Sequence, residues 1–340
     1  MNKKLLTVAV AAAMVAPMSA MSASNVTLYG KAHISQDYVD ADSNADLFDG
    51  WDTVSRASRL GVKGSEDLGN GLKGIFKMEF QIAMTDNNDD INDNDGGSIK
   101  MRNSYVGLSG NWGTALIGRH DTPLKISTGR LDLFADRMAD YNNTVKFFDV
   151  RADNAVAYVS PTMLGGLTLA GAIVSPGGST VTGGKDGDAD GPADAYSVAA
   201  MYSNGPFFLA AAHEFYSDDM ITPGGASDDF KLYRVGAGFN WEAFTINGIS
   251  EAHDSDPTAG GEDPTMWQVQ GQWKFGNNAL KAMYGDYDGD DGAEDQSTYA
   301  VGLDHNFSKR TTAYLLWTDV DSDAADADYK GASLGVIHKF

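Results

Sequence analysis

Residues 119–151 read RHDTPLKISTGRLDLFADRMADYNNTVKFFDVR, and they interrupt a chain that otherwise alternates between apolar and polar residues. Helical spacing predicts one apolar face of a short helix, made by Leu131, Phe134, Ala135 and Met138. Three aspartates at intervals of four share another face of that helix: Asp132, Asp136 and Asp140. An amphipathic helix needs a surface to lie against. We therefore expect the flanking strands to close into a barrel, with this insert folded inside it.

The segments around the insert carry the two-residue period of strands that are wet on one side only. From Val26 to Ser35, small or apolar residues alternate with polar ones. From Leu72 to Ile82, an apolar face opposes a face of lysine, glutamate and glutamine. Such strands fit a barrel wall, and they also fit a two-sheet sandwich.

The spacing of the turns decides between these folds. Short turns are predicted near residues 67–70, 110–111, 161–165, 204–205, 241–242, 276–278 and 308–309. Long polar loops separate them, near residues 40–53, 84–97, 120–150, 174–192, 217–228, 253–264, 286–296 and 319–328. Seven turns alternating with eight loops imply sixteen strands, and this asymmetry is typical of a membrane barrel. A soluble sandwich, the alternative, has no reason to gather all its short turns at one end.

Aromatic residues lie beside the short turns, where a membrane interface would hold their amphipathic rings. They are Trp112, Phe207, Phe208, Phe239, Trp241, Phe244, Trp273, Phe275 and Phe307. In a sandwich they would be core residues. The final strand has Leu334, Val336, His338 and Phe340 on one face. In a barrel it must pair with the first strand, because an open edge in lipid leaves backbone groups unsatisfied.

Residues 1–23 have the features of a secretory signal peptide. Lys3 and Lys4 precede an apolar run, and small residues follow it. The run from Leu5 to Ala16 is too short for a membrane helix, which needs about 20 residues. We expect cleavage after Ser22 or Ala23, which leaves residues 24–340 as a single barrel domain.

Without the leader the chain has 23 basic and 47 acidic residues, a formal charge of −24. This charge excludes nucleic acid as a plausible partner, because phosphate binding needs a basic surface. It favours cations near the protein. The chain has no cysteine, so an exported protein of this sequence must rely on backbone pairing or a large core rather than on disulfides.

Several segments resemble those of the Gram-negative trimeric general porins, especially the neisserial-type branch. In family order they are Val26–Gly30, Ser58–Gly69, Tyr105–Leu108, Gly118–Arg119, Asn154–Tyr158, Ser160–Pro161 and the terminal Phe340. The resemblance implies an all-β, 16-stranded antiparallel transmembrane barrel, with a third extracellular loop folded into the pore. It implies passive diffusion of ions and small hydrophilic solutes through a homotrimer in the cell outer membrane.

The same resemblance makes Phe340 part of the signal that the outer-membrane assembly machinery reads. Outer-membrane lipid and lipopolysaccharide are the expected surroundings. The third loop lacks the Pro-Glu-Phe-Gly-Gly run of the enterobacterial branch. The constriction residues of that branch therefore cannot be transferred to this chain one by one.

Fourteen of the 23 basic residues of the mature chain precede residue 152. Arg59 and Arg102 fall on polar strand faces, and Arg119 ends the strand that enters the insert. If they face Asp132, Asp136 and Asp140, they set a transverse field at the narrowest point, as charged rows do in ion-selective pores. Alternatively, the arginines only solvate a polar wall and the aspartates only a wet helix face. We predict a cation-preferring passage.

Acidic runs occupy the loops at Asp86–Asp95, Asp286–Asp295 and Asp319–Asp328, and a solvated surface is their simplest explanation. Asp186–Gly191 matches the first half of a calcium loop, but Ser197 stands where the bidentate glutamate belongs. Gly331–Gly335 and Gly69–Gly74 match enzyme motifs, yet neither precedes a helical pattern. The six histidines show no metal-ligand spacing. We expect no catalytic site, metal or cofactor.

Three classes of function remain. The first is a non-specific diffusion channel, and the second is a substrate-selective channel for an anionic nutrient. The third is an enzyme or adhesin mounted on the barrel, for which no serine–histidine pairing is visible. A selective channel needs stacked aromatics or a continuous basic path, and the insert offers mainly Phe147 and Phe148. We favour the diffusion channel, and a reversal potential across a salt gradient would discriminate most sharply.

Overall fold

The structure is a computed structural model that describes residues 25–41, 49–85, 99–175, 192–217, 229–255, 263–289, 295–324 and 328–340. The predicted signal peptide at 1–23 and the aspartate runs at 86–95 and 186–190 lie outside these residues, as do parts of the runs at 286–295 and 319–328. The first wall strands are β1 (Asn25–Ala41), β2 (Gly50–Ser55), β3 (Arg59–Gly69), β4 (Leu72–Ile82), β5 (Ile99–Met101), β6 (Ser104–Gly110), β7 (Gly113–Asp121), β8 (Arg151–Val159) and β9 (Leu167–Val174). The others are β10 (Ala195–Asn204), β11 (Phe207–Tyr216), β12 (Phe230–Trp241), β13 (Phe244–Ser255), β14 (Thr265–Phe275), β15 (Asn278–Asp288), β16 (Gln296–Asn306), β17 (Thr311–Ser322) and β18 (Tyr329–Lys339).

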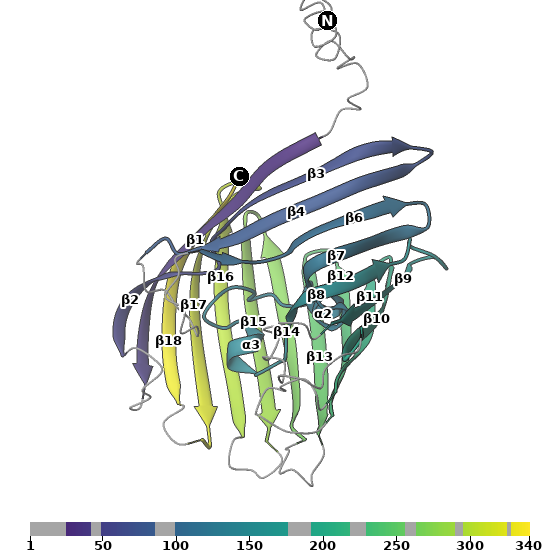
Figure 1. The fold of residues 1–340 in the computed structure, drawn as a ribbon. Coiled ribbons are helices and arrows are strands. Elements are labelled where there is room, and N and C mark those ends of the chain that lie inside the picture. The colour runs from purple at the N-terminus through teal and green to yellow at the C-terminus, as the bar shows by residue number, and fades with distance from the viewer. Residues whose placement is uncertain are drawn as a thin grey trace, which may run out of the picture.

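These segments form one antiparallel sheet that closes on itself (Figure 1). Both β2 and β3 pair with β1, and both β5 and β6 pair with β4, so each couple is one interrupted wall strand. The described residues therefore build sixteen wall strands. Pairing of β1 with β18 completes the ring. The predicted all-β, 16-stranded antiparallel barrel is confirmed.

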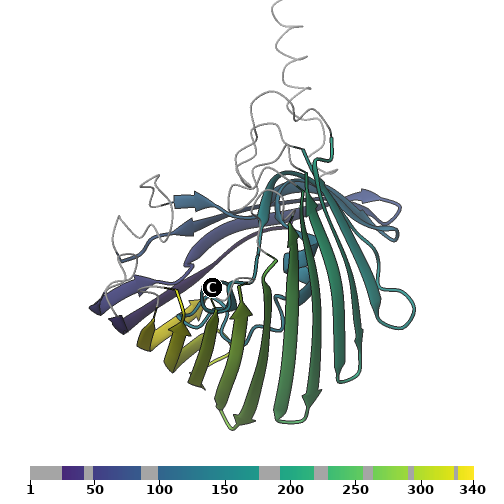
Figure 2. The same cartoon turned by 90° about the horizontal axis from the view of Figure 1, so that it is seen from below.

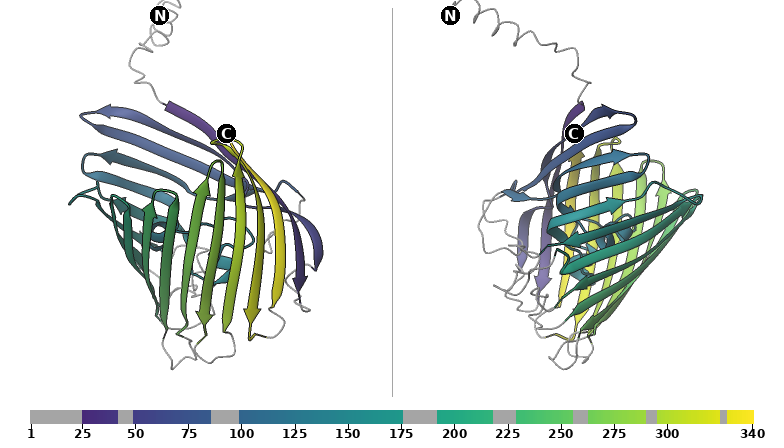
Figure 3. Two further views of the ribbon diagram at one scale, coloured as in Figure 1. Left: turned by 180° about the vertical axis from the view of Figure 1, so that it is seen from behind. Right: turned by 45° about the vertical axis from the view of Figure 1, so that its right-hand side comes forward.

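The connections follow the predicted alternation. Within the described residues seven connections are short, at residues 70–71, 111–112, 160–166, 205–206, 242–243, 276–277 and 307–310. Because neighbouring strands run in opposite directions, all seven lie at the end of the barrel where β1 begins (Figure 3). Each matches a turn that the sequence predicts.

The two faces of the wall are the reverse of those in a soluble protein. On β12, Tyr233 and Val235 are 47% and 57% exposed, whereas Arg234 between them is 1% exposed. On β16, Tyr299 and Val301 are exposed while Thr298 is buried. An apolar outer face with polar groups turned inward suits a barrel surrounded by lipid. No helix among the described residues is long and apolar enough to cross a membrane.

Two groups of exposed aromatic rings mark the borders of the outer face. The group at the short turns is the predicted one and includes Trp112, Phe207, Trp241, Phe244, Trp273, Phe275 and Phe307. A second group near the long loops includes Tyr38, Trp51, Tyr196, Tyr233, Trp267 and Tyr299. The prediction is wrong for Phe208, because successive residues on β11 point to opposite faces. Phe208 is buried inside the barrel.

Residues 122–150, called the insert below, lie inside the ring of strands, where the teal segment is seen in Figure 2. The predicted helix through Leu131 and Met138 does not form. The helices are instead α2 (Pro123–Thr128) and α3 (Tyr141–Thr144), with turns between them. Leu131, Phe134 and Met138 are nevertheless buried, whereas Ala135 is exposed.

Two aspartates explain why the middle of the insert is not helical. The Asp132 carboxylate accepts a hydrogen bond from the Phe134 backbone N–H at 2.8 Å. Asp140 accepts from the backbone N–H of Asp136 at 2.6 Å and caps α3 through that of Asn142 at 3.0 Å. Such local bonds compete with helical ones. Asp136 itself has a φ of 59°, which ends any helix that reaches it.

The insert packs against the inner face of the second half of the wall. Its buried side chains form one cluster with residues of β11 and β13–β17, among them Phe208, Ile249, Met266, Met283, Tyr314 and Leu316. Glycines on the wall make room for them. A Cβ on Gly331 would collide with the Met138 sulfur, and one on Gly285 would collide with the Val145 side chain.

Candidate functional site

Arg234 of β12 binds both ends of the insert. Its buried guanidinium donates to Glu251 of β13, to Asp149 at 2.6 Å, to the Thr128 hydroxyl at 3.1 Å and to the Phe148 carbonyl at 2.9 Å. Glu251 in turn accepts from the Phe148 backbone N–H at 2.9 Å. Thr128 ends α2 and Asp149 lies at the far end of the insert, so one wall arginine joins both arms of the insert.

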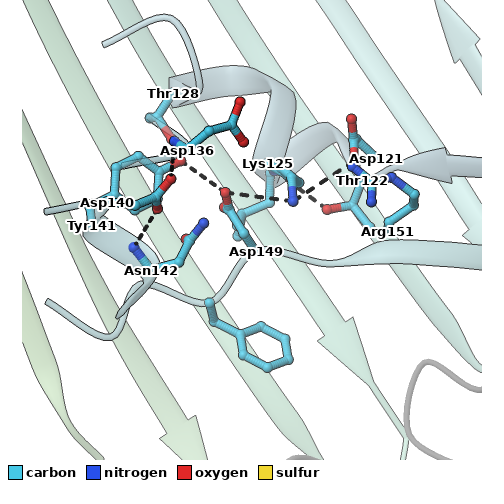
Figure 4. A network of polar contacts seen from close by, with 12 residues as sticks. Asp121, Thr122, Lys125, Thr128, Asp136, Asp140, Tyr141, Asn142, Asp149 and Arg151 are labelled. Carbon is cyan, nitrogen blue, oxygen red and sulfur yellow. Dashed lines mark hydrogen bonds and ion pairs between the residues drawn. The ribbon is translucent and has the colours of Figure 1, made fainter. Parts of the chain in front are cut away.

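A chain of charged groups crosses the same region (Figure 4). Lys125 of α2 lies 3.8 Å from Asp121 and 4.0 Å from Asp149. Arg151 is 2.9 Å from Asp121. Tyr141 donates to Asp149 at 2.9 Å. These contacts tie the insert to β7 and β8, the strands from which it emerges.

Asp136 is the aspartate of the insert that reaches basic side chains of the first wall strands. Its carboxylate forms an ion pair with Lys31 of β1 and lies 3.5 Å from Arg59 of β3. Burial alone would raise the pKa of Asp136, but its attraction to Lys31 and Arg59 outweighs burial and holds that pKa below the usual value. Asp136 is therefore charged near neutral pH, and the predicted opposition of Arg59 and Asp136 is present.

Arg102 and Arg119 have other partners. Arg102, between β5 and β6, donates to Glu79 at 3.0 Å and to the Gln81 side chain at 3.0 Å. Arg119 of β7 pairs with Asp153 on the neighbouring strand β8. Both arginines are thus bound to acceptors of the wall itself, while Arg59 is the member of the predicted set that the structure brings to the insert.

Asp132 and Asp140 differ from Asp136 in charge as well as in position. Burial, together with the nearby Asp140, raises the pKa of Asp132 well above its usual value. Burial raises the pKa of Asp140 to about 6, against the hydrogen bonds that it accepts from backbone N–H groups. Both carboxylates shape turns of the insert through their hydrogen bonds. Near neutral pH the charge of Asp132 is reduced, whereas Asp140 loses its charge only when the pH falls through about 6.

Two residues important to this region were absent from the predicted set. Lys31 is buried against Asp136, and Glu79 accepts from both Arg102 and Tyr29, the latter at 2.8 Å. Lys31 follows Thr27 and Tyr29 on the polar face of β1. That alternation could have identified it, because residues two apart on a strand share a face.

Phe340 lies at the closing edge of the barrel. Its backbone exchanges hydrogen bonds with Gly30 of β1, at 3.0 and 3.1 Å. Phe340 is 52% exposed, on the same outer side as Leu334 and Val336. The outward position expected for this aromatic residue is thus observed.

Comparisons with known proteins agree with this architecture. The family model of Gram-negative porins matches residues 9–325 of this chain. Outer membrane porin protein 32 of Delftia acidovorans is 30% identical, over 92% of this chain and 88% of that protein. Major outer membrane protein P.IB of Neisseria meningitidis serogroup B is 26% identical over the whole of both chains.

Among solved structures, the anion-selective porin from Comamonas acidovorans superimposes with a TM-score of 0.76 at 24% identity, covering 93% of this chain and all of that one. These relatives are porins of the outer membrane rather than enzymes. The closed barrel, its apolar outer face and the match over residues 9–325 lead to one conclusion: the chain belongs to the Gram-negative porin family of the outer membrane.

Proposed function

We propose that the chain is a water-filled channel for passive diffusion of ions and small hydrophilic solutes, and that the insert narrows it. The insert is packed against strands of the second half of the wall. From there Asp136 reaches Lys31 of β1 and Arg59 of β3. A loop held on one side of a bore restricts the passage along the other side, here the wall from β3 to β8.

The charges beside that passage support a weak preference for anions at the narrowest point. Lys31 and Arg59 supply two cations for the single carboxylate of Asp136. Burial raises the pKa of Asp132 well above its usual value, which reduces its negative charge. Asp140 keeps its charge above about pH 6, and its carboxylate accepts hydrogen bonds from the backbone N–H groups of Asp136 and Asn142. A constriction is screened by salt less than an exposed mouth is. We therefore propose that anions are preferred in concentrated salt.

The cation preference expected from the sequence assumed three aspartates facing three arginines. Among these six residues, Asp136 and Arg59 form such a pair, at 3.5 Å. The acidic loops still favour cations around the mouth in dilute salt, and there the cation preference stays a prediction. The Comamonas porin is described as anion-selective. For this chain the same direction is proposed from Lys31, Arg59 and Asp136.

The test is the reversal potential across a potassium chloride gradient in a planar bilayer, in dilute and in concentrated salt. In concentrated salt the parent should prefer anions weakly, Asp136→Asn should strengthen that preference, and Lys31→Gln should weaken it. Asp319→Asn is the control, because Asp319 pairs at 3.8 Å with the exposed Lys330 instead of with the insert. A cation preference that persists in concentrated salt would refute the proposed selectivity.

A second candidate is a channel selective for an anionic nutrient. It is favoured by a basic path that continues below Arg59, where Lys63 and Lys77 lie 5.2 and 5.9 Å from the centre of the Tyr29 ring. A continuous basic path is one of the features that such a channel needs. Small carboxylates that block chloride current at concentrations far below those of the salt would favour this candidate. Equal permeation of neutral and anionic solutes of the same size would exclude it.

We further propose that the protein is a homotrimer surrounded by outer-membrane lipid and lipopolysaccharide. The proposal follows from family membership and from the broad apolar outer face. Cross-linking and native mass measurement in mild detergent should give a heat-resistant trimer. Detection of monomer alone would contradict it.

A further inference from the structure

An ion pair outside the predicted set fixes the tip of the insert, the part around Arg137, to the wall. Arg137 donates two hydrogen bonds to Asp304 of β16, at 2.7 and 2.9 Å. The guanidinium also stacks on Tyr314 of β17, with 4.4 Å to the ring centre. Both charged residues are buried, at 5% and 6% exposure. Paired, two-pronged geometry of this kind fixes orientation as well as distance.

Lys281 of β15 strengthens the same anchor. Its ammonium group is 2.8 Å from Asp304 and donates to the Leu133 carbonyl at 2.9 Å. The Gln270 side chain accepts from the Leu133 backbone N–H at 2.7 Å. Asp304 therefore balances two buried cations and is the centre of the contacts that hold the tip.

Arg137 and Asp136 are adjacent, yet their side chains bind different strands of the wall. Arg137 turns towards β16 and β17, and Asp136 turns towards Lys31 and Arg59 on β1 and β3. The left-handed backbone of Asp136, with φ at 59°, produces this divergence. The position of the Asp136 carboxylate therefore depends on the wall that holds Arg137.

We propose that Asp304 and Arg137 are positioning residues of the passage: their ion pair holds the insert so that the Asp136 carboxylate stays beside Lys31 and Arg59. This inference rests on the proposed function, because it assumes that Asp136 contributes to ion selectivity. Asp304 acts through Asp136 and not through its own charge, which Arg137 and Lys281 already balance.

The main experiment is a double-mutant cycle on the full-length protein, read out as the reversal potential in concentrated salt. Asp304→Asn keeps the shape of the side chain but removes the counter-ion of Arg137. It should shift the reversal potential towards anions, as Asp136→Asn does. The double variant should shift it no further than Asp136→Asn alone. Shifts that add would mean that Asp304 acts by its own charge, and would overturn the proposal.

A second measurement separates this proposal from the proposed function and from misfolding. The chain has no cysteine, so Met138→Cys is a unique thiol at a site that is 5% exposed behind the tip. Adding Asp304→Asn should raise its labelling by a polar maleimide at least about tenfold, because local opening exposes the thiol. Adding Asp319→Asn should leave labelling unchanged, and Arg137→Lys should give an intermediate rate.

The outcomes are distinct. Unchanged labelling with Asp304→Asn would overturn the positioning role, whatever the selectivity. Increased labelling in a chain whose Asp136→Asn variant has the selectivity of the parent would support the anchor but refute the proposed function of Asp136. A heat-modifiable, strand-rich barrel for every variant establishes that folding has not failed.

Discussion

Gly30 and Phe340 close the barrel as a backbone pair, with the Gly30 N–H donating to the Phe340 carbonyl at 3.0 Å and the Phe340 N–H donating to the Gly30 carbonyl at 3.1 Å. The Phe340 ring lies over Gly30, where an added Cβ would collide with the ring carbons. The chain's last residue is therefore part of the seam between β18 and β1. The lack of a side chain at Gly30 leaves room for the Phe340 ring. Contacts within one barrel therefore explain this glycine, and contact between barrels is not needed to explain it.

Changes at this seam should impair assembly more than they impair conduction. Deletion of Phe340, or Phe340→Asp, removes the outward aromatic and should sharply reduce the amount of protein in the outer membrane. Gly30→Val should have a smaller effect in the same direction, because its side chain displaces the ring. Phe307→Ala, which changes an exposed aromatic away from the seam, is the control. Normal outer-membrane levels of the deletion variant would contradict an assembly role for Phe340.

Acid should increase the preference of the passage for anions, and Asp140 should be the main cause. Burial raises the pKa of Asp140 from 3.8 to about 6, whereas attraction to Lys31 and Arg59 outweighs burial at Asp136 and lowers its pKa. As the pH falls through about 6, Asp140 becomes neutral while Asp136 stays charged. Reversal potentials in concentrated salt should shift towards anions in this range. The shift should be lost in Asp140→Asn and retained in Asp319→Asn.

The same raised pKa predicts the pH dependence of the insert's stability. Between the usual pKa of 3.8 and the folded value of about 6, the folded protein binds more protons than the unfolded chain. The contribution of Asp140 to stability therefore falls as the pH rises through this window. Hydrogen exchange of the α3 amides, corrected for the intrinsic effect of pH, should show less protection above pH 6 than below pH 4. Equal protection at both pH values would contradict the raised pKa.

The barrel could be predicted from sequence because strand periodicity is a local signal. Met78 is exposed on the outer face and Glu79 is buried on the inner one, as the alternation along β4 requires. Turn residues such as Asn70 and Gly71 mark where one strand ends and the next begins, and so give the number of strands. Phe208 shows the limit of this reasoning, because nearness to a turn does not determine the face on which a ring lies.

The site was less predictable, since its contacts depend on groups that are distant in sequence. The spacing of Asp132, Asp136 and Asp140 suggested a helix, but local side-chain hydrogen bonds replaced it with turns. The burial of Leu131, Phe134 and Met138 was still predicted correctly. Asp304 accepts hydrogen bonds from Arg137, which is 167 residues away in the sequence. This contact depends on how the insert lies on the wall. No local pattern records that relationship.

Neutralising the acidic rim should alter selectivity in dilute salt only. Asp286, Asp288 and Asp295 line one cavity of about 240 Å³ together with Asp321 and Asp323. Salt at physiological strength screens exposed charges beyond about 8 Å. Converting Asp286, Asp288 and Asp295 to Asn should therefore reduce cation preference in dilute salt and have little effect in concentrated salt. An equal effect in both would mean that these carboxylates act at the constriction.

A disulfide between Val145→Cys and Gly285→Cys should form readily and leave conduction unchanged. A Cβ built on Gly285 lies 3.4 Å from the Val145 Cβ, close to the separation of about 3.5–4.5 Å found in disulfides. The parent has no cysteine, so the bond has no competitor within the chain. Val145→Cys with Gly171→Cys is the matched control, because nothing lies within 4 Å of a Cβ on Gly171. Oxidation should change the mobility of the first variant on a non-reducing gel but not that of the second. Single-channel conductance of the oxidised protein should equal that of the parent, because the bond joins residues already in contact. If the bond failed to form, or if forming it closed the channel, the insert would not occupy the position on β15 from which its role in the passage has been argued.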